Sequence, residues 1–175
     1  GIASFKKGGF IVDACKVDNK IPKTLLQTKL PKSWRLILIN DKKIKGQHGK
    51  VEFELFNIIK KEKNIFRDLP DIVLRGIIPS ILYDDFEKFT FAFNKFQKLT
   101  SKFYTLKQSC TFISENINRI MNYIQKHHNL PVGQSSWGPL SYIFTESLDK
   151  AKEIKNILEK NYCNYDNLTY TIVRP

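Results

Sequence analysis

Residues 141–173, SYIFTESLDKAKEIKNILEKNYCNYDNLTYTIV, contain two strand patterns separated by a helix pattern. Ser141 to Thr145 is a short apolar run, and Leu168 to Val173 alternates between two faces, as strands do. Between them, Ser147 is a favourable N-cap, and apolar residues then recur at helical spacing at Leu148, Ala151, Ile154 and Leu158. The helical patterns further upstream are grouped together, so we expect an α+β fold rather than a doubly wound sheet.

The N-terminal third of the chain adds further strand patterns. Trp34 to Asn40 is almost entirely apolar and β-branched, which predicts a strand buried on both faces. Phe10 to Val12 is a shorter run of the same kind and follows Gly8-Gly9. The stretch from Lys16 to Lys32 is polar and contains two prolines, so we expect it to be a connection without regular structure.

Four helices are predicted before residue 130. One begins near Val51, and a short one around Ile72 to Ile78 lies between two prolines. A long helix starts at Asp84-Asp85 and carries five aromatic rings on one stripe: Phe86, Phe89, Phe93, Phe96 and Phe103. We expect this stripe to pack into the core, with cofactor stacking as the alternative. The next helix, Phe112 to His128, ends in two histidines, which we interpret as cationic C-terminal residues rather than metal ligands.

The composition restricts the class of protein. The 175 residues are 42% hydrophobic and 13% aromatic, as in a folded globular chain. No stretch approaches 18 uninterrupted apolar residues, so we expect no transmembrane helix and no membrane partner. The three cysteines, at positions 15, 110 and 163, lack metal-site spacing and predict a reducing, cytoplasmic compartment.

The formal net charge is +12, from 29 basic and 17 acidic residues. Such an excess attracts polyanions, including nucleic acid and phosphorylated metabolites. Only five of the basic residues are arginines, and the lysines are spread along the chain. Because sequence-reading proteins favour arginine, we expect no nucleic-acid partner.

The segment GQSSWGP, Gly133 to Pro139, contains the most informative chemistry. Its two glycines permit a sharp turn with exposed N–H groups, and the residues between them supply hydroxyl, carboxamide and indole donors. We expect it to form a loop between a helix and a strand, where binding residues often lie. An ordinary Gly/Pro/Ser connector is the alternative.

Two segments carry a resemblance to a known family. The first, GIASFKKGGFIVD (Gly1–Asp13), resembles a signature of the beta-ribofuranosylaminobenzene 5'-phosphate synthases, and Gly133 to Pro139 resembles that family's second signature. Between them, Trp34, a Gly46/Gly49 loop and an Ile78-Pro79 pair occur in the expected order. The chain departs from the family at Ala14-Cys15, where glycines are usual.

The resemblance implies membership of the GHMP kinase superfamily and a particular fold. We expect the C-terminal half of a GHMP-kinase-like α+β fold, with helices packed on an antiparallel, ferredoxin-like sheet. Residues 1–45 are then the incomplete end of the N-terminal domain, and 46–175 form the C-terminal-like domain. A chain that begins at Gly1 lacks the first half of such an enzyme, so we expect this piece to be inactive by itself.

The implied activity is that of a pentosyltransferase. Such an enzyme joins the ribose 5-phosphate of phosphoribosyl pyrophosphate to 4-aminobenzoate or 4-hydroxybenzoate, releasing pyrophosphate and CO2, in tetrahydromethanopterin biosynthesis. Mg²⁺ is the implied cofactor, and the sequence does not identify its ligands; a homodimer is possible. Asp13 is the candidate catalytic residue, steadying the cationic sugar or the metal. The candidate substrate-binding residues are Gly8, Gly9, Gly133, Gln134, Ser135, Ser136, Trp137 and Gly138.

Each of these residues also has a purely structural interpretation. Gly8-Gly9 is a turn before a strand, Asp13 a strand-end cap, and Trp137 a core residue beneath the loop. Two other functions remain open. An ATP-dependent small-molecule kinase of the same superfamily is disfavoured because Ser135-Ser136-Trp137 replaces a glycine-rich motif. A nucleic-acid-binding module would require a stripe of lysines on one face.

Overall fold

The computed structural model describes residues 6, 8–14, 21–45, 67–104, 111–136 and 138–175. The helix predicted from Val51 and the Gly46/Gly49 loop lie outside these residues. The described elements are β1 (Phe10–Asp13), β2 (Thr24–Thr28), β3 (Arg35–Asp41), α3 (Leu69–Ile72), the π-helical turn η1 (Val73–Ile77), α4 (Ile78–Leu82), α5 (Phe86–Tyr104), α6 (Glu115–His128), β4 (Val132–Gln134), β5 (Ser141–Thr145), α7 (Leu148–Asn161) and β6 (Leu168–Val173).

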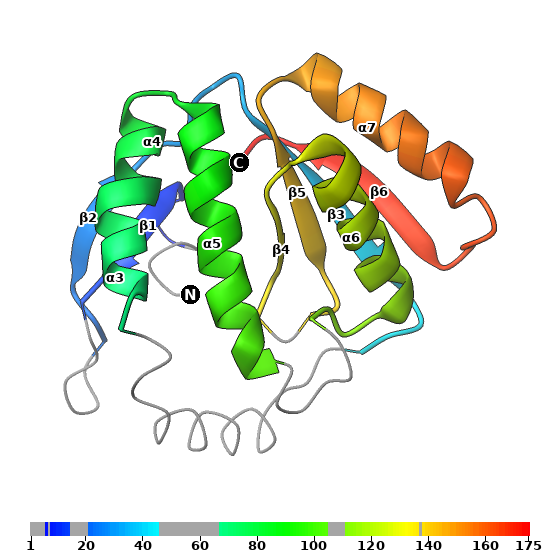
Figure 1. Cartoon of the computed structure of the whole chain (residues 1–175), viewed down its shortest axis with the longest axis horizontal. Coiled ribbons are helices and arrows are strands. Elements are labelled where there is room, and N and C mark those ends of the chain that lie inside the picture. Colours follow the sequence, from blue (N-terminus) through cyan, green and yellow to red (C-terminus); the bar gives the residue numbers. More distant parts are fainter. Residues whose placement is uncertain (1–5, 7, 15–20, 46–66, 105–110, 137) are drawn as a thin grey trace.

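The larger sheet has four antiparallel strands in the order β4-β5-β3-β6 (Figure 1). The chain reaches β4 from β3 through helices that end with α6, and it passes from β5 to β6 through α7. This is the order of a split βαβ, or ferredoxin-like, sheet. The predicted α+β class, with helices packed on an antiparallel sheet, is confirmed. The more specific GHMP-kinase assignment stays a prediction.

Helices cover both faces of this sheet because its strands alternate between two apolar clusters. Ile37, Ile39 and Ile143 face one side, where they pack with buried residues of α6 and α7 in what we call the α6/α7 cluster. Their neighbours Leu36 and Phe144 face the other side, where they pack with Trp34, α5 and the α3–α4 helices in the α5 cluster. The period-2 alternation of strand side chains thus builds two cores from one sheet.

The phenylalanine stripe of α5 packs into the α5 cluster. Phe89 and Phe93 are buried, and their ring centroids lie 5.1 and 5.3 Å from that of Phe144. Trp34 is 1% exposed, and its ring centroid lies 4.7 Å from that of Phe89. The prediction that these rings form core is confirmed for the described members; the side chain of Phe103 lies outside the described part.

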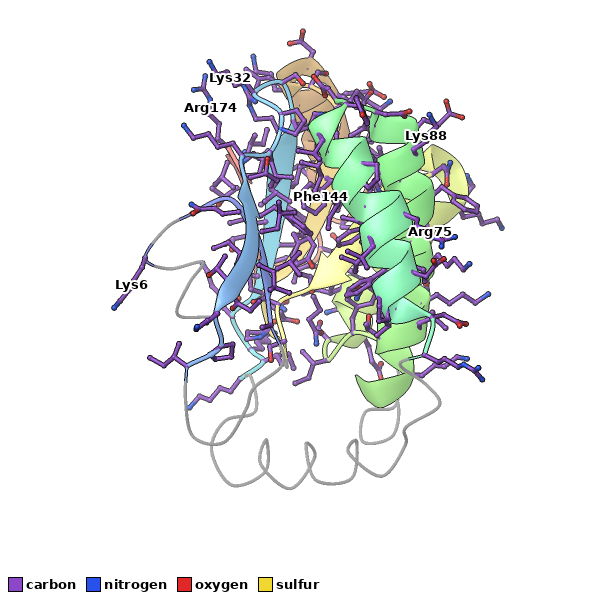
Figure 2. The ribbon with its side chains drawn as sticks, turned by 90° about the vertical axis from the view of Figure 1, so that its left-hand side faces the viewer. Lys6, Lys32, Arg75, Lys88, Phe144 and Arg174 are labelled. Carbon is purple, nitrogen blue, oxygen red and sulfur yellow. The ribbon has the colours of Figure 1, made fainter. Side chains whose placement is uncertain are left out.

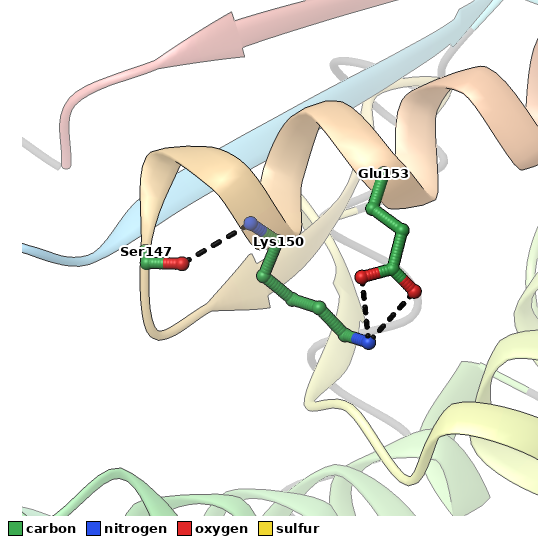
Figure 3. Close-up of polar contacts among 3 residues, drawn as sticks. All are labelled: Ser147, Lys150 and Glu153. Carbon is green, nitrogen blue, oxygen red and sulfur yellow. Dashed lines mark hydrogen bonds and ion pairs between the residues drawn. The ribbon is translucent and has the colours of Figure 1, made fainter.

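The start of α7 agrees with its local sequence signal, whereas α6 begins at Glu115, later than the predicted start at Phe112, and ends at His128 as predicted. Ser147 caps α7 by accepting a hydrogen bond from the Lys150 N–H at 3.1 Å, and the Lys150 ammonium pairs with Glu153 at 2.9 Å (Figure 3). Ser114 caps α6, which ends at His128 with the left-handed Asn129 after it. The strands predicted at Ser141 to Thr145 and Leu168 to Val173 have the bounds of β5 and β6.

A second, two-stranded sheet joins β1 and β2, with Phe10 opposite Thr28 and Asp13 opposite Thr24. The prediction of an irregular connection from Lys16 to Lys32 is wrong for β2, because pairing with β1 decides its structure and local composition does not. The predicted boundary at residues 45 and 46 also differs from the structure. It separates β3 from β5 and β6, which β3 pairs with in the middle of the larger sheet.

No helix among the described residues is long and apolar enough to cross a membrane.

Candidate functional site

The segment Gly133 to Gly138 forms the turn between β4 and β5. Gly133 and Gln134 belong to β4 and lie opposite Tyr142 and Ser141 of β5. The Ser135 N–H donates to the Leu140 carbonyl at 2.8 Å, and the Gly138 N–H donates to the Ser135 carbonyl at 2.9 Å. The predicted loop is therefore partly strand, and two of the N–H groups that we expected to face a phosphate are hydrogen-bonded within the turn.

Gly133 allows the ring of Tyr142 to lie directly against the β4 backbone. A Cβ at this position would be 2.6 Å from the Tyr142 phenol carbon and oxygen, closer than any side chain tolerates. Tyr142 also packs against the α5 cluster. The glycine thus leaves the space over β4 that the Tyr142 ring occupies, and a larger residue would have to displace this ring.

Gln134 connects the turn to the segment that precedes α6. It is 6% exposed, its Oε1 accepts a hydrogen bond from the Ile113 N–H at 2.8 Å, and its Nε2 donates to the Ser136 carbonyl at 2.9 Å. A Cβ on Gly138 would lie 2.6 Å from the Ile113 side chain, so the turn and this segment are in close contact. The carboxamide acts as a clamp inside the protein.

Among the described residues of the turn, Ser135 and Ser136 are the exposed ones. Ser136 has a φ of 51° and Gly138 a φ of 71°, so the chain passes twice through the left-handed region within three residues. A turn held at both of these residues presents its serine side chains in a defined orientation. Trp137 lies outside the described residues, and its predicted stacking role stays a prediction.

A buried carboxylate, that of Asp41, is hydrogen-bonded to the segment that connects the turn to α6. Asp41, at the end of β3, is 3% exposed and accepts hydrogen bonds from the Ser114 hydroxyl at 2.6 Å, the Lys43 N–H at 3.0 Å and the Asn167 amide. Burial raises the pKa of Asp41, but the hydrogen bonds from Ser114 and Asn167 outweigh it and hold that pKa below its ordinary value. Asp41 thereby fixes the start of α6, next to Ile113.

A cleft of about 540 Å³ lies between α5 and α6 beside β4. Its lining includes the rings of Phe91 and Phe112 and two cations, Lys95 and Lys98. Asn94 also lines it, and the carboxamide oxygen of this residue is buried without a hydrogen-bond partner. An aromatic wall with ammonium groups and an unused acceptor suits a flat polar ligand.

Within the first signature segment, the described residues 8–13 lie at and in β1 of the two-stranded sheet. Gly8 and Gly9 are exposed and have φ values of 66° and 76°, and a Cβ on Gly9 would be 2.5 Å from the Thr28 carbonyl oxygen. Asp13 ends β1, is exposed, and accepts a hydrogen bond from the Thr24 hydroxyl at 3.1 Å. Gly9 therefore allows the chain that enters β1 to approach the Thr28 backbone closely, whereas the Asp13 carboxylate faces solvent.

The two glycine segments lie at opposite ends of the molecule. Since Thr145 pairs with Arg35 and Ser141 with Ile39, the β4–β5 turn lies at the level where β3 ends. Gly8-Gly9 lies beside Thr28, just before the connection that leads to the start of β3. Figure 1 shows the β4–β5 turn at the bottom and the β2–β3 connection at the top. The predicted substrate residues thus form two separate groups.

Sequence reasoning missed the residues that support the turn. Tyr142, Asp41 and Ser114 come from three different elements, and only pairing of β5 with β4 and of β3 with β5 places them near Gly133 to Gly138. For Asp41, the one sequence signal of a supporting role is its position directly after an apolar strand pattern. Among the described residues, no group of three or more His, Cys, Asp or Glu side chains is arranged to hold a metal ion.

Comparisons with known proteins add no relatives. No protein-family model matches the chain, and a search of curated proteins also finds no match.

Proposed function

We propose that this chain is the C-terminal portion of a beta-ribofuranosylaminobenzene 5'-phosphate synthase. The observation that carries the proposal is the presence of both signature segments, Gly1–Asp13 and Gly133 to Pro139, in a chain whose larger sheet has ferredoxin-like order. The reaction would form a carbon–carbon bond between the anomeric carbon of ribose 5-phosphate and the ring of the aromatic acid. Pyrophosphate would leave from the sugar and CO2 from the ring.

The exposed side of the β4–β5 turn supports a role in binding phosphate. With the Ser135 and Gly138 N–H groups used internally, the hydroxyls of Ser135 and Ser136 are the exposed side-chain donors of the described turn. Donors held in place before the reaction stabilise the negative charge that develops on a leaving pyrophosphate. The clamp made by Gln134 keeps the turn from rearranging when that charge appears.

The α5–α6 cleft supports a site for the aromatic acid. A benzoate needs an apolar contact for its ring and a cation for its carboxylate, and the exposed ring of Phe91 and the Lys98 ammonium supply these two types of group. Phe112 directly precedes Ile113, whose N–H is held by Gln134 of the turn. The cleft and the turn are therefore joined through one short segment.

Asp13 supplies one exposed carboxylate that is suited to contact a Mg²⁺ ion. Mg²⁺ typically binds proteins through one or two carboxylates and takes its remaining ligands from substrate phosphates and water. Asp13 is exposed and uses one oxygen to accept from Thr24, so its other oxygen is suited to such a contact. When bound at Asp13, the ion would neutralise charge on phosphate groups of the substrate. In its alternative role, without the metal, the carboxylate itself would stabilise positive charge on the sugar.

The test uses the intact protein with phosphoribosyl pyrophosphate and 4-hydroxybenzoate or 4-aminobenzoate. We expect equal amounts of pyrophosphate and CO2 to be released. Replacing Ser135 and Ser136 together by alanine should lower kcat/KM for phosphoribosyl pyrophosphate by about 10- to 100-fold, because charged hydrogen bonds are lost. Ser33→Ala, an exposed serine elsewhere, is the matched control. ATP turnover without CO2 release would instead identify the GHMP kinase alternative.

A further inference from the structure

A pocket of about 490 Å³ lies where the start of β1, the β2–β3 connection and the end of β6 meet. Gly8 and Gly9 form one part of its lining, Lys29 and Lys32 another, and Arg174 the third. Its volume is in the range of small-molecule sites. Figure 2 shows Lys32 and Arg174 at the same end of the molecule.

The described lining of this pocket contains three cations and no carboxylate side chain. The four ion pairs found among the described residues all lie on helices, and none includes Lys29, Lys32 or Arg174. On the helical side, by contrast, Arg75 and Lys88 are each paired with a neighbouring aspartate (Figure 2). The positive charge of the pocket is therefore not neutralised by the described acidic side chains.

The charge of the described residues is unevenly distributed along the chain. Among the described residues, positions 6–45 contain eight basic and two acidic side chains, and one of these acids, Asp41, is buried. Positions 67–175 contain thirteen basic and eleven acidic side chains. The excess that composition alone attributed to dispersed lysines is thus concentrated around the two-stranded sheet and β3, where it raises the local concentration of anions.

The walls of the pocket are held in place by the protein. The Arg35 guanidinium donates to the carbonyls of Lys32, Ser33 and Trp34 at 2.7, 2.9 and 2.7 Å, which fixes the end of the β2–β3 connection. Leu30 packs against the α5 cluster from the same connection. A site with fixed walls loses little conformational entropy when a ligand binds.

Gly8 leaves the floor of the pocket open. Nothing lies within 4 Å of where its Cβ would be, whereas Gly9 is pressed against the Thr28 carbonyl. A glycine with φ of 66° and free space above it lets a ligand approach the backbone closely. Phosphate groups are commonly bound in this way, by glycine backbone with cations around it.

We propose that this pocket binds the phosphate groups of a small phosphorylated molecule, with Lys29, Lys32 and Arg174 as the charged contacts. The site is separate from the β4–β5 turn, which lies at the other end of the sheet. The proposal does not depend on the synthase activity, since it requires neither an aromatic acid nor a glycosyl transfer. A diphosphate suits three cations better than a single phosphate does, because its charge is larger.

Isothermal titration of the full chain with inorganic pyrophosphate tests the proposal. We expect saturable binding of one pyrophosphate, weakened about tenfold or more in Lys29→Ala/Lys32→Ala and in Arg174→Ala. The control is Lys23→Ala/Lys152→Ala, which removes the same charge as the double variant from exposed lysines outside the pocket lining. Circular dichroism confirms that every variant is folded. The control should bind like the unaltered chain.

Four results would overturn the proposal. The first is an absence of saturable binding, and the second is equal weakening in the control, which would mean that only the overall field attracts the anion. The third is loss of binding in Ser135→Ala/Ser136→Ala with no loss in the lysine variant, which would place the phosphate at the turn and leave the proposed function intact. A single-stranded oligonucleotide that binds more tightly, with a steep salt dependence, would identify a nucleic-acid surface instead.

Discussion

Replacing Gln134 by alanine should destabilise the fold, because the structure makes this residue a clamp inside the protein. Its carboxamide is 6% exposed and forms two hydrogen bonds, one from the Ile113 N–H and one to the Ser136 carbonyl. A residue that only contacted substrate would leave the stability of the free protein unchanged. The stability of the Gln134→Ala variant thus distinguishes a structural role of Gln134 from a role in substrate binding alone.

The expected loss is about 2 kcal/mol. Two neutral hydrogen bonds contribute about 1 kcal/mol each, and the deleted methylene contributes about 0.8 kcal/mol of burial. The alanine variant does not lose the side-chain conformational entropy that glutamine loses on folding, and this offsets about 1 kcal/mol of the loss in stability. The remaining loss in the free energy of unfolding is large compared with the few tenths of a kcal/mol that a substitution at an exposed position typically costs.

Urea unfolding of the full chain at pH 7, followed by circular dichroism, measures this difference. Ser135→Ala, at the exposed neighbouring position, is the matched control and should change the free energy of unfolding by less than about 0.5 kcal/mol. Gln134→Glu keeps the shape but places a second acceptor against the Ser136 carbonyl, so it should be at least as destabilising. A Gln134→Ala chain as stable as the control would refute the clamp.

Other consequences concern the hairpin, the buried carboxylate and a buried phenol. Gly9→Ala should lower the thermal midpoint more than Gly8→Ala, because only at Gly9 does the new methyl meet a carbonyl at 2.5 Å; equal shifts would contradict this. The lowered pKa of Asp41 means that its stabilisation is complete above about pH 4, the ordinary range, and is lost as pH falls through the folded pKa. The unfolding free energy of Asp41→Asn should therefore vary less between pH 5 and pH 2 than that of the unaltered chain. The exposed control Asp166→Asn should vary as the unaltered chain does. If the pH profiles of all three proteins are parallel, Asp41 does not contribute this pH-dependent stabilisation. Burial raises the pKa of Tyr170 to about 12, so stability should fall as pH rises above the ordinary value near 10. Burial also raises the pKa of Tyr162, so absorbance titration of the folded chain should show more than one late phenol, and the latest should be missing from Tyr170→Phe.

Several parts of the fold were predictable because their signals are local. Ser147 caps α7 through its own side chain, and the bounds of β5 and β6 follow from short apolar and alternating runs. The phenylalanine spacing of α5 identified a buried face. Caps and periodicity act over one or two turns of chain, so the residues that carry them suffice to predict them.

Pairing between distant strands could not be predicted in the same way. β2 forms a strand because β1 lies beside it, and β3 belongs to the larger sheet despite its distance in sequence from β5 and β6. Neither result is a property of the residues of one segment. Strand pairing depends on which partner is available, and that is a property of the assembled chain.

The sequence by itself determined the α+β class, the Ser147 cap of α7, the core face of α5 and the glycines that permit sharp turns. Only the tertiary structure decided what those glycines do. Pairing with β5 uses the Ser135 N–H within the turn, the Tyr142 ring covers Gly133, and the antiparallel sheet carries Gly8-Gly9 to the opposite end from Gly133. The physical reason is that a residue type defines which conformations and hydrogen bonds are possible, whereas the neighbours brought by folding define which of them remain open to a ligand.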